Sequence, residues 1–194
     1  MYPLIKIPAF ASKDFFSFSK EEAKEYFKWV LQIKNERIKI LEQYVHKAYP
    51  EWKLDFTRES FEQLYKWFSN QVAYRDMNED EKEAVKKQIS MTPLLVDVIP
   101  IPELTFTDET VSICFDIGLY LGDSLICQNK EIKWTTKLNS TNYIYYGQPL
   151  IAKAKSKVPL NPRASMEGIA RRILDKDCKE ITFVQLFSIN TARL

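Results

Sequence analysis

The sequence contains few of the residues on which most enzyme sites depend. Of its 194 residues, only four are glycine and one is histidine. Phosphate-binding loops need clustered glycines, so the sequence predicts no nucleotide-binding loop. His46 is the single histidine, which excludes a zinc site with two histidine ligands and makes any serine or cysteine triad depend on that residue. We interpret His46 as structural, because it lies near the end of a predicted helix, where a cation is favoured.

Cysteine is also scarce. Cys114, Cys127 and Cys178 are odd in number and widely spaced, and no two of them form the C-x-x-C pattern of zinc or redox sites. The pattern indicates reduced thiols in a cytoplasmic protein, and we expect no metal and no cofactor. The first residues do not resemble a secretory signal, and no run of eighteen apolar residues is present, so we expect no membrane span.

Charge of one sign is lacking as well. The sequence has 28 lysine and arginine residues against 26 aspartate and glutamate residues, which gives a net charge of +2. This balance supplies no strong field for nucleic acid or for an anionic membrane. An aromatic group around Trp134 has Lys153, Lys155 and Lys157 nearby in sequence and could stack single-stranded bases. We rank that use below binding to a protein and below packing in the core.

The stretch from Thr107 to Asn129 predicts one long helix that is apolar over most of its surface. Thr107 or Asp108 is a good N-cap residue, and acidic residues in the first turn suit the helix dipole. The apolar face is wider than a surface helix needs, so we expect this helix to be central. Gly118 and Gly122 lie four residues apart, which favours close packing of another element over contact with a ligand.

One side of this helix carries a polar stripe at spacings of three or four residues. The stripe consists of Glu109, Ser112, Asp116, Tyr120 and Asp123. We interpret it first as the solvated face of the helix, so that Asp116→Asn leaves stability nearly unchanged. Contact with a partner is the second interpretation. A site for a hard cation, or acid and base catalysis, is the third.

The remaining pattern predicts an α+β fold with an N-terminal helical pair, a central buried helix, a small antiparallel sheet and a C-terminal helix. We expect one domain, 1–194, in which a helical half of about 1–90 packs on an α+β half of about 91–194. An extended arm precedes helices expected at 20–49, 58–74 and 79–89. Strands are expected at 94–99, 131–138, 143–146, 150–154 and 181–189, and a helix opens at Asn161-Pro162.

The C-terminal half also carries a resemblance to known proteins. The motifs are Gly118-Leu119-Tyr120-Leu121-Gly122-Asp123, Trp134, Tyr146-Gly147-Gln148-Pro149 and Asn161-Pro162. In this order they resemble a set of small bacterial proteins of unknown function, some of which look like immunity proteins of toxin systems. The similarity covers roughly residues 105 to 175. It implies a cytoplasmic binding protein that blocks a partner, with no cofactor and no catalytic residues.

These observations favour a non-enzymatic cytoplasmic protein that binds another protein, with an immunity-type inhibitor as the particular form that the resemblance implies. The partner-binding residues that we expect are Asp116, Tyr120, Asp123, Tyr143, Tyr145, Arg171 and Arg172. The alternative is a small-molecule-binding protein or an enzyme whose site lies between the helical half and the sheet. In that case Asp116, Tyr120 and Asp123 line the site, and Arg171 or Arg172 contacts an anion.

Overall fold

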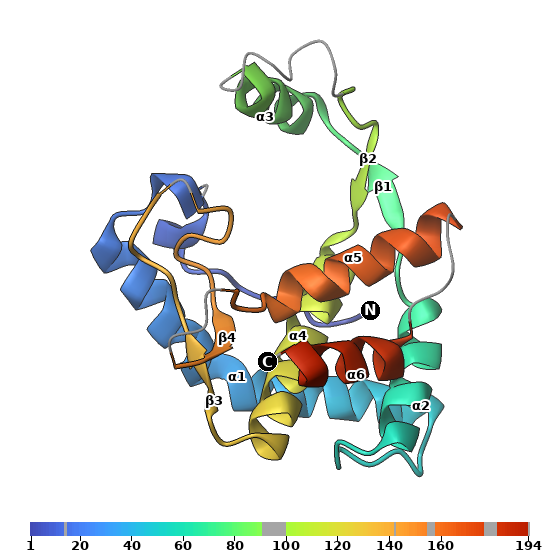
Figure 1. The fold of residues 1–194 in the computed structure, drawn as a ribbon. Coiled ribbons are helices and arrows are strands. Elements are labelled where there is room, and N and C mark those ends of the chain that lie inside the picture. The colour runs from blue at the N-terminus through green and yellow to red at the C-terminus, as the bar shows by residue number, and fades with distance from the viewer. Residues whose placement is uncertain (14, 91–99, 142, 155–157, 177–181, 194) are drawn as a thin grey trace.

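The computed structural model describes residues 1–13, 15–90, 100–141, 143–154, 158–176 and 182–193 (Figure 1). Its elements are η1 (Ala9–Ala11), η2 (Phe15–Ser17), α1 (Lys20–Ala48), α2 (Arg58–Ser69), β1 (Tyr74–Asp76), α3 (Glu79–Ser90), β2 (Leu104–Phe106), α4 (Asp108–Gln128), β3 (Ile132–Thr135), β4 (Leu150–Lys153), α5 (Pro162–Asp175) and α6 (Phe183–Arg193). The chain is therefore an α+β protein with a helical N-terminal part and a C-terminal helix, as the sequence predicts.

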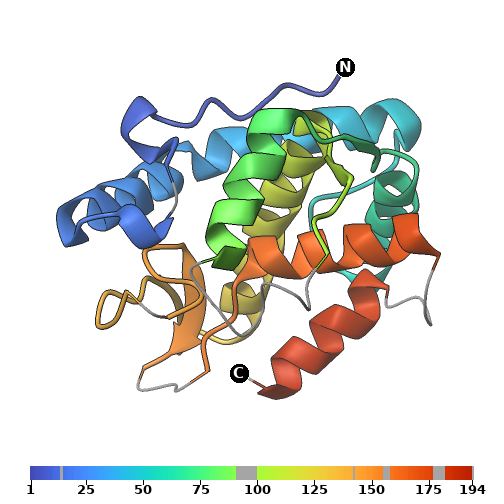
Figure 2. The ribbon, with the colours of Figure 1, turned by 90° about the horizontal axis from the view of Figure 1, so that it is seen from above.

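Helix α4 is the centre of the structure. The helices α1, α5 and α6 and the strand β3 all pack against it (Figure 2). Every residue from 112 to 122 is buried, although only part of this stretch is apolar. The predicted central helix is confirmed, and so is its start, where the Thr107 side chain accepts a hydrogen bond from the backbone N–H of Thr110.

Local capping explains where the other long helices begin. At the start of α1, the Ser19 hydroxyl accepts from the Glu22 N–H, and the Glu22 carboxylate accepts from the Ser19 N–H. This capping box satisfies two backbone donors that the first turn leaves without partners. At α5 the Asn161 side chain accepts from the Ala164 N–H, and Pro162 occupies the first helical position. Both helix starts were predicted from the sequence.

The two glycines of α4 allow close packing on two sides of the helix. A β-carbon at Gly118 would lie 2.9 Å from the backbone nitrogen of Arg163, so the start of α5 rests directly on α4. A β-carbon at Gly122 would overlap the ring of Trp134 from β3. Real side chains do not occupy such distances, so both contacts depend on glycine. The prediction that these positions admit close approach is confirmed.

The described strands form two small antiparallel sheets. In one sheet β3 pairs with β4, from Ile132 opposite Lys153 to Thr135 opposite Leu150. In the other, β1 pairs with β2, and this ribbon carries α3 away from the rest of the molecule (Figure 1). The predicted small sheet corresponds to β3 and β4. The β1–β2 ribbon was not predicted, because strands of three residues are too short to show an alternating pattern.

Some predicted elements are wrong. The predicted strand 181–189 is wrong from Phe183 onward, where the chain forms the helix α6, and Thr182 and Gln185 cap each other's backbone N–H groups at its start. Residue 181 lies outside the described residues. Short apolar runs fit either structure, and here the cap and the helical spacing of Phe183 and Phe187 decide. The segment Tyr143–Tyr146 forms turns and a single bridge to Lys137. The second helix ends at Ser69, before β1. The strand predicted at 94–99 lies outside the described residues.

Among the described helices, only α4 is long and apolar enough to cross a membrane by composition. Most of that helix, 78% of the most apolar window, is buried inside the protein. A central helix of a packed core meets the same criteria, so this property is weak evidence for a membrane span.

Candidate functional site

The polar stripe of α4 lies inside the protein. Ser112, Asp116 and Tyr120 are each at most 1% exposed, and Asp123 is half-buried. The interpretation of the stripe as a solvated face is therefore wrong, and so is the reason for expecting Asp116→Asn to be neutral. The helical spacing of the polar residues could not reveal this burial, because α1, the N-terminal segment and the loop before α2 cover the polar side of α4.

Asp116 lies at the centre of a buried polar cluster. Arg37 of α1 donates from Nε and Nη2 to the two carboxylate oxygens, each at 2.8 Å, and Tyr2 donates its hydroxyl at 2.5 Å. Arg37 also donates to the backbone carbonyl of Pro3 at 2.9 Å. Burial raises the pKa of Asp116 to about 6, and the Arg37 guanidinium opposes this rise. The cluster holds the N-terminal segment against α1 and α4.

Tyr120 belongs to a second internal cluster. Its hydroxyl accepts from the backbone N–H of Phe56 at 3.1 Å and lies 3.2 Å from the Ser60 hydroxyl. Its ring packs against Trp52, Phe56 and Phe61. Phe56 has a φ of 60°, a backbone conformation that residues other than glycine rarely adopt. Tyr120 therefore fixes the connection between α1 and α2.

Asp123 of the stripe also has internal partners. Its carboxylate forms an ion pair with Lys34 of α1 and accepts a hydrogen bond of 2.9 Å from the indole nitrogen of Trp134. The side chains of Lys34 and Asp123 are 18% and 23% exposed. This contact ties β3 to α1 and α4. Asp116, Tyr120 and Asp123 thus belong to three separate contacts and do not converge on one pocket.

The other residues expected in a partner site lie elsewhere. Tyr143 and Tyr145 pack edge to face in the loop before β4, with ring centroids 6.0 Å apart, and both are half-buried. Arg171 and Arg172 are exposed on α5. Arg171 lies over the Phe106 ring, with its guanidinium carbon 4.9 Å from the centroid. The structure therefore does not bring the seven expected residues together.

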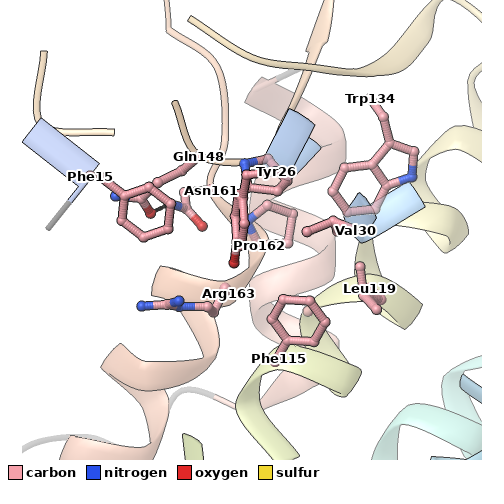
Figure 3. A pocket seen from close by; sticks show the side chains of 12 residues that line it. Phe15, Tyr26, Val30, Phe115, Leu119, Trp134, Gln148, Asn161, Pro162 and Arg163 are labelled. Carbon is pink, nitrogen blue, oxygen red and sulfur yellow. Dashed lines mark hydrogen bonds between the residues drawn. The ribbon is translucent and has the colours of Figure 1, made fainter. Parts of the chain in front are cut away.

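A small cavity lies where a site between the helical half and the sheet was expected. Phe115 and Leu119 of α4, Tyr26 and Val30 of α1, and Trp134 of β3 surround it, together with the start of α5 (Figure 3). Its volume is about 20 Å³, which accommodates roughly one water molecule. Pockets for small molecules span roughly 300–1,000 Å³. None of Asp116, Tyr120 and Asp123 lines this cavity.

A much larger open groove of about 770 Å³ follows β3 and the chain on either side of it. We call it the lysine groove, because Lys130, Lys133, Lys137 and Lys153 line it and Glu131 is the only acidic residue among the described residues of its wall. Within the described part of the chain, none of these four lysines forms an ion pair. The wall is therefore strongly cationic on a chain whose net charge is nearly zero.

Two further residues characterise the lysine groove. The hydroxyl oxygen of Thr136 is buried and has no hydrogen-bond partner among the described residues. A buried hydroxyl without a partner is rare, because it loses its bonds to water on folding. Trp134 lines both the groove and the small cavity, and its indole N–H is already bonded to Asp123. The groove thus combines uncompensated positive charge with an unsatisfied polar atom.

Reasoning from the sequence missed this groove. Lys130, Lys133 and Lys137 surround the Trp134 strand closely, and that local cluster was the available signal. It was obscured because the balanced net charge averages it away, and because the lysines considered beside Trp134 were Lys153, Lys155 and Lys157. Of those three, only Lys153 lies within the described residues and lines the groove.

Metal and thiol chemistry receive no positive support from the described residues. No three His, Cys, Asp or Glu side chains in these ranges lie close enough together to hold a metal ion. Cys114 is buried and Cys127 is exposed, and both are free. Burial raises the pKa of the Cys114 thiol, which makes it less reactive.

No protein-family model, curated protein or solved structure matches this chain.

Proposed function

We propose that this chain is a non-enzymatic protein that binds another protein, and that the lysine groove contacts an acidic part of that partner. The main support is that the four lysines of the groove have no carboxylate partner in the described structure. The groove is distinguished by the grouping of these charges, since four lysines line it with one described acidic residue, Glu131.

The physical argument is electrostatic complementarity. Like charges gathered in one groove repel one another and contribute nothing to folding, so an acidic partner gains attraction without first breaking internal pairs. Such charges accelerate encounter and select against basic partners more than they add to affinity.

The proposal takes its particular form from the resemblance to immunity-type proteins over residues 105 to 175. In that form the partner is a protein that the chain inhibits by covering part of its surface, and both act in the cytoplasm. The lysine groove falls within this stretch. No cofactor, metal or nucleic acid takes part.

Affinity capture from native lysate, followed by mass spectrometry, tests the proposal. The charge-reversed variant is Lys130→Glu/Lys133→Glu, at two exposed positions of the groove. The matched control is Lys28→Glu/Lys39→Glu, which changes the charge equally at exposed positions of α1 outside the groove. We expect the wild type and the control to retain one stoichiometric protein partner, and the groove variant to recover at least about tenfold less of it.

Two results contradict the proposal. One is equal recovery of the partner by the groove variant and the control, because the groove charges then play no part. The other is recovery of nucleic acid, with no stoichiometric protein, by the wild type. Denaturation curves of all three proteins accompany the capture, because equal stabilities ensure that a loss of binding is not a loss of folding.

A further inference from the structure

The lysine groove has an edge strand of the described sheet, β3, in its wall. Five consecutive residues, 133–137, line it. Ala152, Lys153 and Ala154 also line it, so the groove lies across both paired strands of the sheet. β4 is the only strand paired with β3 in the described structure. The side of β3 opposite β4 is therefore an edge without a described partner strand, on the strand that forms one wall of the groove.

The two edges of this sheet differ. On the outer side of β4, Ile151 and Leu160 exchange two backbone hydrogen bonds of 2.9 Å. On the outer side of β3, no described backbone group bonds to residues 133–136. A strand uses only about half of its N–H and C=O groups toward one neighbour, so the other half of these groups on β3 have no backbone partner among the described residues.

From these observations we infer that the partner contributes an extended acidic segment, which pairs with the open edge of β3 as a third strand of the sheet. This inference rests on the proposed function of the lysine groove and adds the mode of recognition. Main-chain hydrogen bonds to β3 supply the attachment, as in other cases of strand addition, and side chains at alternate positions supply the choice of partner.

The spacing of the lysines defines the chemistry of the segment. Lys133 and Lys137 lie four residues apart along extended chain, so their side chains lie on the same side, with Thr135 between them. An added strand places every second side chain opposite this row. Acidic residues at alternate positions therefore face the lysines. Thr136, whose hydroxyl is buried and has no described partner, is part of the same wall.

A synthetic peptide of about nine residues that alternates glutamate and threonine serves as the probe, because it has the charge pattern and can extend as a strand. It is titrated into the full chain while backbone amide signals are followed by NMR. We expect binding with shifts concentrated at 133–137 and weakened at least about tenfold by Lys130→Glu/Lys133→Glu. The control Lys28→Glu/Lys39→Glu binds as the wild type does.

Backbone methylation separates strand pairing from simple charge attraction. Alternate N–H groups of an extended peptide point to opposite sides, so methylating one alternate set removes the bonds to β3 and methylating the other set does not. We expect one methylated peptide to bind at least about tenfold more weakly and the other to bind nearly as the parent does. Equal affinities of the two methylated peptides overturn the inference, as does the absence of binding by the parent peptide.

Two further comparisons distinguish a failure of strand pairing from a failure of the proposed function. The first uses two other probes, a peptide with the same glutamates in one block and a single-stranded oligothymidine. If either binds as tightly as the alternating peptide, charge alone is recognised, and strand pairing is overturned. If the captured protein is still lost from the groove variant, the proposed function survives that result. If the variant captures the protein normally, the proposed function fails whatever the peptides do.

Discussion

The polar stripe of α4 and the lysine groove along β3 are both rich in charge, and they use it in opposite ways. On α4, Asp116 and Asp123 are each matched by a basic residue of α1 and by a further donor, Tyr2 or Trp134. In the groove, lysines lie beside lysines. Paired charge inside a protein specifies how the chain packs, whereas uncompensated charge at an open edge is available to another molecule.

The largest expected effect comes from breaking the buried pair. Arg37→Met leaves the Asp116 carboxylate without its guanidinium, and we expect the free energy of unfolding to fall by about 3–5 kcal/mol. Chemical denaturation measures the change. Arg37→Met/Asp116→Leu is the informative control, because removing both charges restores much of the stability. A loss below about 1 kcal/mol for the single variant would place Asp116 in contact with water after all.

The pKa of Asp116 predicts a dependence of stability on pH. Because burial raises this pKa to about 6 from its ordinary value of 3.8, the folded chain holds the proton more tightly than the unfolded chain. The stabilising contribution of the protonated group is complete below about pH 4 and is lost as the pH rises through about 6, by up to about 3 kcal/mol. Denaturation of the wild type beside Asp116→Asn between these pH values isolates the effect. A constant difference between the two proteins argues against it.

Leucine at either glycine of α4 tests the close packing. Gly118→Leu meets the backbone of α5 and Gly122→Leu meets the Trp134 ring, so each should lower stability by about 1–3 kcal/mol or more. Gly168 is the matched control, since a β-carbon there meets nothing within 4 Å and the residue lies on an exposed part of α5. Gly168→Ala should raise stability by up to about 1 kcal/mol. Tolerance of both leucines would contradict the position of α4.

Tyr120→Phe makes a smaller change, because it removes one hydroxyl and keeps the ring in its aromatic cluster. The Phe56 N–H loses its acceptor, so we expect a loss of about 1 kcal/mol in the free energy of unfolding. The same substitution at Tyr145 is the comparison, since that ring is only half-buried. An equal effect at both tyrosines would mean that the bond to Phe56 contributes nothing.

The smallest effect on stability is expected in the lysine groove. Lys130→Glu/Lys133→Glu should change the free energy of unfolding by no more than about 0.5 kcal/mol per position, because both side chains are exposed. Reduced repulsion among the lysines gives the change a stabilising sign. Denaturation measures it against Lys28→Glu/Lys39→Glu. A strong destabilisation would show that these lysines stabilise the fold, as the polar stripe of α4 does.

Local signals predicted much of the fold, and contacts distant in sequence limited the rest. The start of the helix at residue 20, the Asn161-Pro162 start and the two close glycines each depend on signals within a few residues, so the sequence alone revealed them. The burial of Asp116 depends on Tyr2 and Arg37, which lie 114 and 79 residues away. No periodicity reports such a partner. The lysine groove likewise forms only when β3 and β4 come together.

Hydrogen exchange of the chain with and without its captured protein partner shows whether the partner binds at the lysine groove. We expect new protection of backbone amides along 132–137, where β3 meets the lysine groove, while amides of α4 keep the protection they already have in the free chain. Protection that changes elsewhere, with none gained along β3, would contradict the assignment of this groove as the surface that binds another protein.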